Sequence, residues 1–227
     1  MEDRLEAIFE GLKQKSSAKQ AIYRNTKETF DQLRSISTNL VTVLRNKITP
    51  VDANIVIEYR HVNDFEFHIK FSGDLLIFIM HSNIITLADN HPLMESTYVN
   101  EDFKRRFFGH IMAYNFMADS IKFSRMNDPG YLLGRFLINI DNHYYLEGVK
   151  QLDLANGTDM AHNRIDEGAL RLFIESAMIA SVNNDLVGPQ LDDISKITVK
   201  QKMENQQVSR GQKLGFVFSH DQYPDNY

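Results

Sequence analysis

Apolar side chains recur at helical spacing through the first part of the chain. The steps between them alternate between three and four residues, as along the buried stripe of a helix. The stripe consists of Tyr23, Thr26, Phe30, Leu33, Ser37, Leu40 and Leu44. It fits a long amphipathic helix that lies on the protein's own sheet, and it also fits a helix that pairs with a second copy across a dimer.

Local signals predict where this helix begins and ends. Its first apolar residues are Leu5, Ile8, Phe9 and Leu12. The stretch from Gly11 to Lys19 is polar and weakly patterned, which makes it a candidate for a break. Because proline disfavours helical geometry in the residue before it, Thr49-Pro50 predicts the end of the helix.

From residue 55 onward the apolar period changes to two, the period of a β-strand. Residues 55–60 and 65–71 alternate between apolar and polar side chains, whereas Asp74–His81 is apolar on both faces, as in a central strand. Ser72-Gly73 suits a two-residue hairpin turn, with Gly73 supplying the positive φ. Three neighbouring antiparallel strands are therefore predicted.

The length of the first loop determines which side chains face each other in these strands. A three-residue loop, Val62–Asp64, places all the large apolar groups on one face, whereas a two-residue loop places charges opposite phenylalanines. The three-residue loop is therefore predicted. The resulting opposite-charge partners are Arg60 with Glu66 and Glu58 with His68.

Residues further along the chain predict a long hairpin. The run from Phe107 to Arg125 and the segment Tyr131–Leu146 form its two strands, joined by the turn residues Asn127–Gly130. Residues 83–106 are expected to be largely irregular, with Thr97–Val99 as a candidate short strand.

The last third of the chain predicts a helix with Asn163 as its N-cap and Asp166 and Glu167 in its first turn. It extends to about Leu186, and Gly188-Pro189 predicts its end. Residues 191–205 fit either an edge strand or a helix, and 214–218 are a candidate last strand.

Together these elements predict an α+β fold with a long N-terminal helix, a meandering antiparallel sheet of about five strands, and one or two C-terminal helices packed on the sheet. The expected organisation is a helical segment, 1–49, that forms one compact unit with a sheet domain, 50–220. Residues 221–227 are expected to be a frayed tail.

Composition narrows the functional classes. The chain has 227 residues, a formal net charge of −5 and no cysteine, so it has neither disulfides nor a thiol nucleophile. The acidic start lacks the apolar run of a secretory signal, and the apolar stretch Leu75–Met80 is too short to cross a bilayer. A cytoplasmic protein without a membrane partner is expected. The acidic balance also makes nucleic acid an unfavourable partner.

Familiar catalytic patterns are missing from the sequence. There is no phosphate-binding glycine loop, nucleophile elbow or zinc-binding helix motif, and no two of the eight histidines are two, three or four residues apart. Neither a cofactor nor a metal is therefore predicted.

Four side chains are the alternative catalytic candidates because they project from one face of two adjacent strands. Carboxylates beside a lysine can hold a divalent ion and polarise a phosphate, so they suit a metal-dependent nuclease or phosphodiesterase. The candidates are Glu58, Glu66, His68 and Lys70. The predicted register, however, already gives these charges partners.

The same face borders apolar residues of the next strand, and a half-apolar, half-charged surface suits a helix, a partner subunit or a ligand. Its residues are Leu75, Ile77, Ile79 and His81. Asp141 and His143, near a predicted strand end, are a second candidate site because they can form a base–orienter pair. The basic run Lys104–Arg106 precedes aromatic residues and could contact phosphates, although it is more typical of a solvated strand start.

These observations favour a non-catalytic cytoplasmic binding or regulatory module that self-associates as a homodimer, with a further protein partner or small ligand left open. The metal-dependent nuclease is the alternative from a different class. A small-molecule sensor with an apolar pocket between sheet and helix is a third hypothesis, supported by the many Met and Phe residues.

Overall fold

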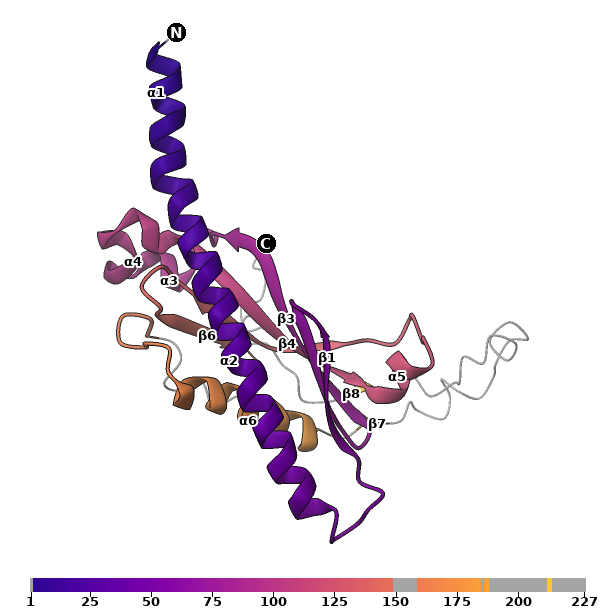
Figure 1. The fold of residues 1–227 in the computed structure, drawn as a ribbon. Helices are drawn as coiled ribbons and strands as arrows, with labels where there is room; N and C mark the ends of the chain where they lie inside the picture. The colour runs from indigo at the N-terminus through magenta and orange to yellow at the C-terminus, as the bar shows by residue number, and fades with distance from the viewer. Residues whose placement is uncertain (1, 149–158, 185, 188–211, 214–227) are drawn as a thin grey trace, which may run out of the picture.

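The computed structural model describes residues 2–148, 159–184, 186–187 and 212–213 (Figure 1). The chain begins with α1 (Glu2–Gly11), a π-helical turn (Leu12–Ser16) and α2 (Ser17–Ile48), which form one continuous helix. The predicted break is therefore wrong. The stretch from Gly11 to Lys19 contains no proline, so its backbone can stay helical. One π-helical turn within it is wider than an α-helical turn. The helix ends at Ile48, close to Thr49-Pro50 as predicted.

Six antiparallel strands form the main sheet in sequence order, each paired with the next. They are β1 (Ile57–Asn63), β2 (Glu66–Phe71), β3 (Asp74–Ile85), β4 (Phe108–Met117), β5 (Tyr131–Ile138) and β6 (Tyr144–Gly148). The α+β class and the meander are confirmed, and the strand count is six where about five were expected.

The additional strand arises because the predicted strand Tyr131–Leu146 folds back on itself. Buried Asn139 accepts hydrogen bonds from the backbone N–H groups of Asp141 and His143, both at 3.0 Å. Asn142 adopts the left-handed conformation with φ 58°. Asparagine tolerates that conformation and bonds to nearby backbone, so this sequence forms a turn instead of a continuous strand.

The predicted register of β1 against β2 is wrong by two residues. Glu58 lies opposite Lys70 and Arg60 opposite His68, because the loop is tighter and a bulge follows His61. The Asn63 side chain accepts a hydrogen bond from the N–H of Phe65 at 2.8 Å, which closes the tight turn. The shift is even, so every side chain keeps its predicted face.

The register of β2 against β3 is confirmed, with Lys70 opposite Leu75, His68 opposite Ile77 and Glu66 opposite Ile79. The turn between them places Ser72 at a positive φ of 54°. The predicted turn is present, but the residue with positive φ is Ser72 and not Gly73.

Residues 86–107 contain three short helical elements and no strand. They are α3 (Pro92–Glu95), α4 (Thr97–Glu101) and a 3₁₀ turn, η2 (Phe103–Arg106). The predicted strand at Thr97–Val99 is wrong, because side chains before each element cap it. The His91 ring accepts from Leu93 N–H, the Ser96 hydroxyl from Val99 N–H, and Asp102 from Lys104 N–H.

The predicted long hairpin is present as β4 and β5, with the short helix α5 (Ala118–Lys122) in its loop. The later helix is α6 (Glu167–Val182), and its N-cap is Asp166, which accepts from Ala169 N–H at 2.7 Å, and not Asn163. Two short strands, β7 (Leu186–Val187) and β8 (Gln212–Lys213), pair with each other. The predictions for residues 188–205 and 214–227 lie outside the described residues.

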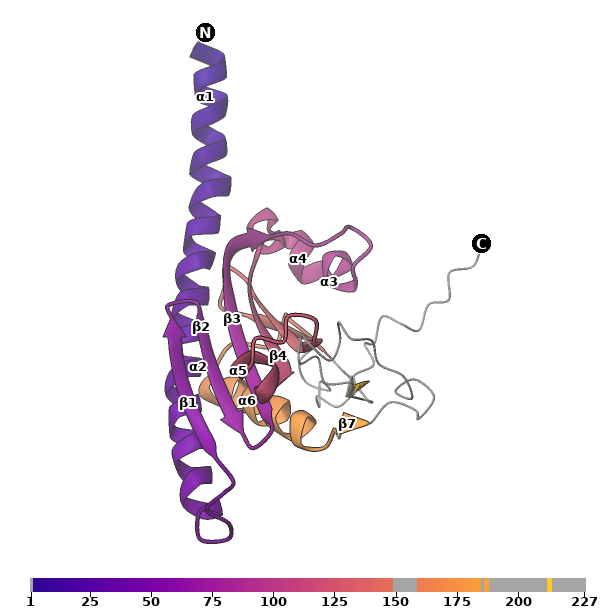
Figure 2. The ribbon, with the colours of Figure 1, turned by 90° about the vertical axis from the view of Figure 1, so that its right-hand side faces the viewer.

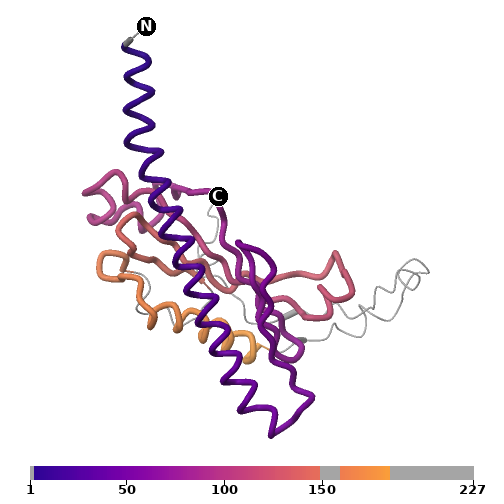
Figure 3. The backbone as a smooth tube through the Cα atoms, viewed as in Figure 1, coloured from indigo at the N-terminus to yellow at the C-terminus, as the bar shows by residue number. Residues whose placement is uncertain are grey.

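Both long helices cover the same face of the sheet. α2 crosses it from β1 to β5 and contacts α6, while α3 and α4 lie toward the opposite face (Figures 1 and 2). Phe30 and Leu33 of α2 and Phe173 of α6 are fully buried against Phe67 and Phe78 of the sheet. The backbone trace shows α1 continuing beyond the sheet at the N-terminal end (Figure 3). Within the described ranges, no helix is both long and apolar enough to span a bilayer.

Candidate functional site

The sheet face opposite α2 and α6, here called the outer face, carries both polar and apolar side chains. Side chains of directly paired residues point to the same side of a sheet, so the register defines this face. Its central members are Ile77, Ile79 and His81 of β3, His110, Met112 and Tyr114 of β4, Arg135 and Leu137 of β5, and Tyr145 and Glu147 of β6. The four residues predicted from β3, including Leu75, therefore do line one face.

Helices α3 and α4 cover one end of the outer face. Leu93 and Met94 of α3 and Val99 of α4 are buried in a second apolar cluster with Phe108 and Leu137 of the sheet. Leu137 of this cluster is the direct partner of His110 across β4 and β5.

A charged network fastens α3 to the outer face. Glu147 Oε1 lies 2.6 Å from His91 Nε2, and its Oε2 accepts from Arg135 Nε at 2.6 Å. Since the Nδ1 of His91 accepts from Leu93 N–H, its Nε2 carries the proton and donates to Glu147. Burial, followed by the charge of Glu147, raises the pKa of the neighbouring Tyr145. Sequence reasoning missed this network because its three members come from separate elements.

His81 and His110 form a stacked pair across β3 and β4. Their ring centroids are 4.6 Å apart and the rings are inclined by 15°. His110 is 8% exposed, and its buried Nδ1 has no hydrogen-bond partner. Burial, together with the charges of the nearby His81 and Arg135, lowers the pKa of His110 to about 4. The His110 ring is therefore neutral at pH 7.

His110 predicts a pH-dependent loss of stability. The unfolded chain binds a proton there at about pH 6.5, whereas the folded chain does so only at about pH 4. Because the unfolded state holds more protons in this window, stability falls as the pH falls. We expect the thermal midpoint to fall more between about pH 7 and about pH 5 in the wild type than in His110→Phe, measured by circular dichroism.

The matched control for this prediction is His162→Gln, which removes an exposed histidine and should keep the wild-type pH dependence. Equal pH slopes for the wild type and His110→Phe would contradict the assignment.

The four alternative catalytic candidates share the outer face of β1 and β2 but do not converge. Glu66 Oε1 lies 2.5 Å from the Nε2 of His68, which is itself buried. Exposed Glu58 lies opposite Lys70, toward the other end of β2. In the described part of the chain, no group of three or more His, Cys, Asp or Glu side chains could hold a metal ion.

Asp141 and His143 do not form the predicted pair. Asp141 Oδ2 accepts from Tyr98 Oη at 2.9 Å and from Arg105 Nε at 2.7 Å. His143 Nδ1 lies 2.8 Å from the backbone oxygen of Met160 and donates to it. The imidazole is thus oriented by a carbonyl group and not by a carboxylate.

The Asp141 contacts belong to a cluster that joins distant parts of the chain. Asn139 Nδ2 donates to Tyr98 Oη at 3.0 Å, and the Arg105 guanidinium lies 4.1 Å from the Tyr98 ring centroid. Asn25 of α2 donates to the oxygen of Ile140 at 3.0 Å. Burial raises the pKa of Tyr98, which keeps its hydroxyl protonated as a donor. The cluster ties α2 and α4 to the β5–β6 turn.

The predicted basic run lies in η2 and not at the start of a strand. Arg105 binds Asp141, and Arg106 binds Asp89 at 3.0 Å, so two of its three charges are already paired. Lys15 and Lys19 of the long helix place their ammonium groups 5.7 and 5.2 Å from the Phe107 ring centroid. A basic and aromatic patch therefore lies where the long helix leaves the sheet.

The start of the long helix carries a second exposed feature, here called the α1 stripe, which runs along α1 to the first residue of the π-helical turn. Its members are Leu5, Ile8, Phe9 and Leu12, which are 68%, 61%, 55% and 57% exposed. In Figures 1 and 2, α1 projects away from the sheet. The spacing of these residues predicted the start of the long helix, but it did not predict that their side chains are exposed while the stripe of α2 is buried.

Comparisons of the chain with protein-family models, with curated proteins and with solved structures found no match.

Proposed function

We propose that this protein is a non-catalytic cytoplasmic binding module that self-associates through the α1 stripe, whose partner is the α1 stripe of a second copy. The observation that carries the proposal is the exposure of four large apolar side chains on one side of a projecting helix. Exposed apolar surface of this kind marks interaction sites, since water is a poor solvent for it.

The buried stripe of α2 supports α1 as the association element. Thr26, Phe30, Leu33, Ser37 and Leu40 are buried, and they lie against the protein's own sheet and α6. The interpretation of that stripe as part of an intramolecular packing is thus confirmed. The α1 stripe lies further along the same helix, and within the described residues no other element packs against it.

The stripe has helical spacing for two turns. Its residues follow steps of three, one and three positions, which places them on one side of the helix. Two such helices can pack along this side, as in a short coiled coil. The buried area is small, so we expect association in the micromolar range and not an obligate dimer.

The charges along the helix favour an antiparallel arrangement. Residues 3–10 carry Asp3, Glu6 and Glu10 against one arginine, whereas residues 13–19 carry three lysines and no acid. Glu10 and Lys13 pair within the helix at 2.9 Å. An antiparallel crossing with Leu5 near Leu12 of the other copy places acidic Asp3 and Glu6 near the other copy's lysines. A parallel crossing places like charges together.

The proposal predicts a dimer that depends on the α1 stripe. We expect the full chain to sediment as a monomer–dimer equilibrium at tens of micromolar. The double substitution Ile8→Gln and Leu12→Gln should raise the dissociation constant by at least about tenfold, because it removes the apolar contact. Sedimentation equilibrium measures this constant, and circular dichroism checks that the helix is retained.

The matched control is Ile179→Gln, which replaces an apolar side chain of similar exposure, 57%, on α6. It should leave the dissociation constant unchanged. Raising the salt concentration from about 0.05 M to about 0.5 M should weaken an antiparallel dimer, because the attraction between its ends is screened. A monomer at tens of micromolar would refute the proposal, and a dimer strengthened by salt would refute the antiparallel arrangement.

A further inference from the structure

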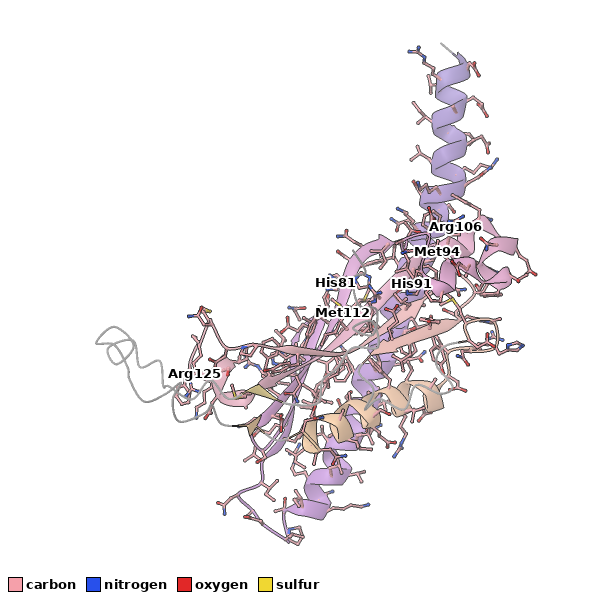
Figure 4. The ribbon with its side chains drawn as sticks, turned by 180° about the vertical axis from the view of Figure 1, so that it is seen from behind. His81, His91, Met94, Arg106, Met112 and Arg125 are labelled. Atoms are coloured by element: carbon pink, nitrogen blue, oxygen red, sulfur yellow. The ribbon has the colours of Figure 1, made fainter. Side chains whose placement is uncertain are left out.

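Three donor side chains lie together on the outer face outside the α1 stripe. His81 and His110 are direct partners across β3 and β4, and Met112 follows His110 by two residues, so it points to the same side. Figure 4 shows His81 and Met112 on the same face, near His91 and Met94 where α3 meets the sheet. The cluster is therefore one thioether beside two imidazoles.

Neither imidazole has a hydrogen-bond partner among the described residues. The Nδ1 of His110 is buried and unpaired, and His81 makes only the ring contact with His110. Buried polar groups in folded proteins are nearly always bonded to protein, water or an ion. The unpaired nitrogen therefore points to a missing partner on the outer face.

Nearby groups are unsuited to be that partner. Both nitrogens of His91 are already used, by Leu93 N–H and by Glu147. Met94 is packed in the apolar cluster under α3. Arg135, the residue opposite Met112, is held by Glu147. None of these three side chains is therefore available to the His110 nitrogen, and a ligand bound here would meet neutral nitrogen and sulfur donors.

We propose that His81, His110 and Met112 bind one soft monovalent cation, Cu(I). Thioether sulfur and imidazole nitrogen are ligands that Cu(I) prefers, whereas Mg²⁺ and Ca²⁺ require oxygen donors. The three donors are neutral and contribute no negative charge, and Arg135 lies beside them, so a monovalent ion is electrostatically less costly here than a divalent one.

Binding requires a change in the orientation of one imidazole ring. Stacked rings do not aim their nitrogens at one point, so one ring has to turn. His81 is half-buried, whereas His110 is only 8% exposed. His81 is therefore the ring that turns. Tyr114 Oη donates to Met112 Sδ at 3.3 Å, which leaves the second lone pair of the sulfur for the metal.

The test is an anaerobic competition between the full chain and a chromogenic Cu(I) chelator. We expect one equivalent of Cu(I) to be withdrawn from the chelator. Met112→Leu, which keeps the apolar volume, and His81→Gln should each weaken the affinity at least tenfold. Met126→Leu, a substitution at an 88% exposed methionine, should leave the affinity unchanged.

Failure to compete with the chelator overturns the proposal, as does an unchanged affinity in Met112→Leu. Tighter binding of Zn²⁺ than of Cu(I) in a parallel competition overturns the assignment of a soft monovalent ion. The site does not depend on the α1 stripe, so the Ile8→Gln and Leu12→Gln variant should bind Cu(I) as the wild type does. The two proposals can therefore fail separately.

Discussion

Replacing Phe67 by alanine should lower the free energy of unfolding by about 3–5 kcal/mol. Phe67 is fully buried on the helix-covered face of β2. Its ring stacks on Phe78 at a centroid distance of 4.8 Å and contacts Phe30 of α2 at 5.3 Å. The substitution removes the ring that joins α2 to two strands and leaves a cavity that the rigid sheet cannot fill. Urea unfolding followed by circular dichroism measures the loss.

The control for this prediction is Phe123→Ala, because Phe123 is 56% exposed after α5. We expect a loss below about 1 kcal/mol there. If Phe67→Ala does not fold, Phe67→Leu provides a milder variant whose loss should still exceed that of the control. Equal losses at the two phenylalanines would show that the core is not centred on Phe67.

The second large effect is expected for Gly109→Ala, where β4 lies directly against Thr26 of α2. A Cβ at Gly109 would lie 1.8 Å from Thr26 Oγ1 and 2.9 Å from Thr26 Cβ. The helix has to move away from the sheet, which should cost about 1–3 kcal/mol or more. The same urea titration measures this cost.

A double-mutant cycle tests the cause of that loss. In a Thr26→Gly background the new methyl group has space, so Gly109→Ala should cost much less than it does alone. The matched control is Gly11→Ala. A Cβ there meets nothing within 4 Å, and alanine in place of helical glycine should stabilise by about 0.5–1 kcal/mol. Additive effects of the Gly109 and Thr26 substitutions would contradict the clash.

Much of the fold follows from local periodicity. The change of apolar period after Pro50 predicted the helix, the strands and the face of each side chain in β1 to β3, because burial on one side of a strand selects every second residue. The long hairpin of β4 and β5 was recognised from its turn residues. Strand β6 was not predicted, because the turn between β5 and β6 depends on one residue, Asn139. Its side chain accepts the backbone hydrogen bonds that a continuing strand would make elsewhere.

Hydrogen bonds to capping side chains determine the secondary structure of residues 86–107, where the apolar periodicity is weak. The caps at His91, Ser96 and Asp102 each begin a turn of helix too short to produce a pattern of its own. In the same way, the Asn63 turn shifted the β1 register by two residues without changing the faces. Hydrogen bonds of one side chain to nearby backbone outweigh a small difference in strand pairing.

The candidate sites were only partly predictable. The alternating residues of β3 that include His81 were predicted to share one face. His110 and Met112, which lie beside His81 in the sheet, are about thirty residues away in sequence and were not predicted to join them. The Glu147 network and the Asp141 contacts likewise join residues from separate elements. Donors that come together from separate segments leave no helical or strand spacing within any one of them.

The α+β class, the long helix and the side chains that share a face in each early strand follow from the order of residues alone, because they depend on interactions between near neighbours. The packing of the whole chain is needed to show that the stripe of α2 lies against the protein's own sheet while the α1 stripe remains exposed. It also brought the two histidines and Met112 together. Those outcomes depend on which surfaces meet across the fold, and that is a property of the whole chain.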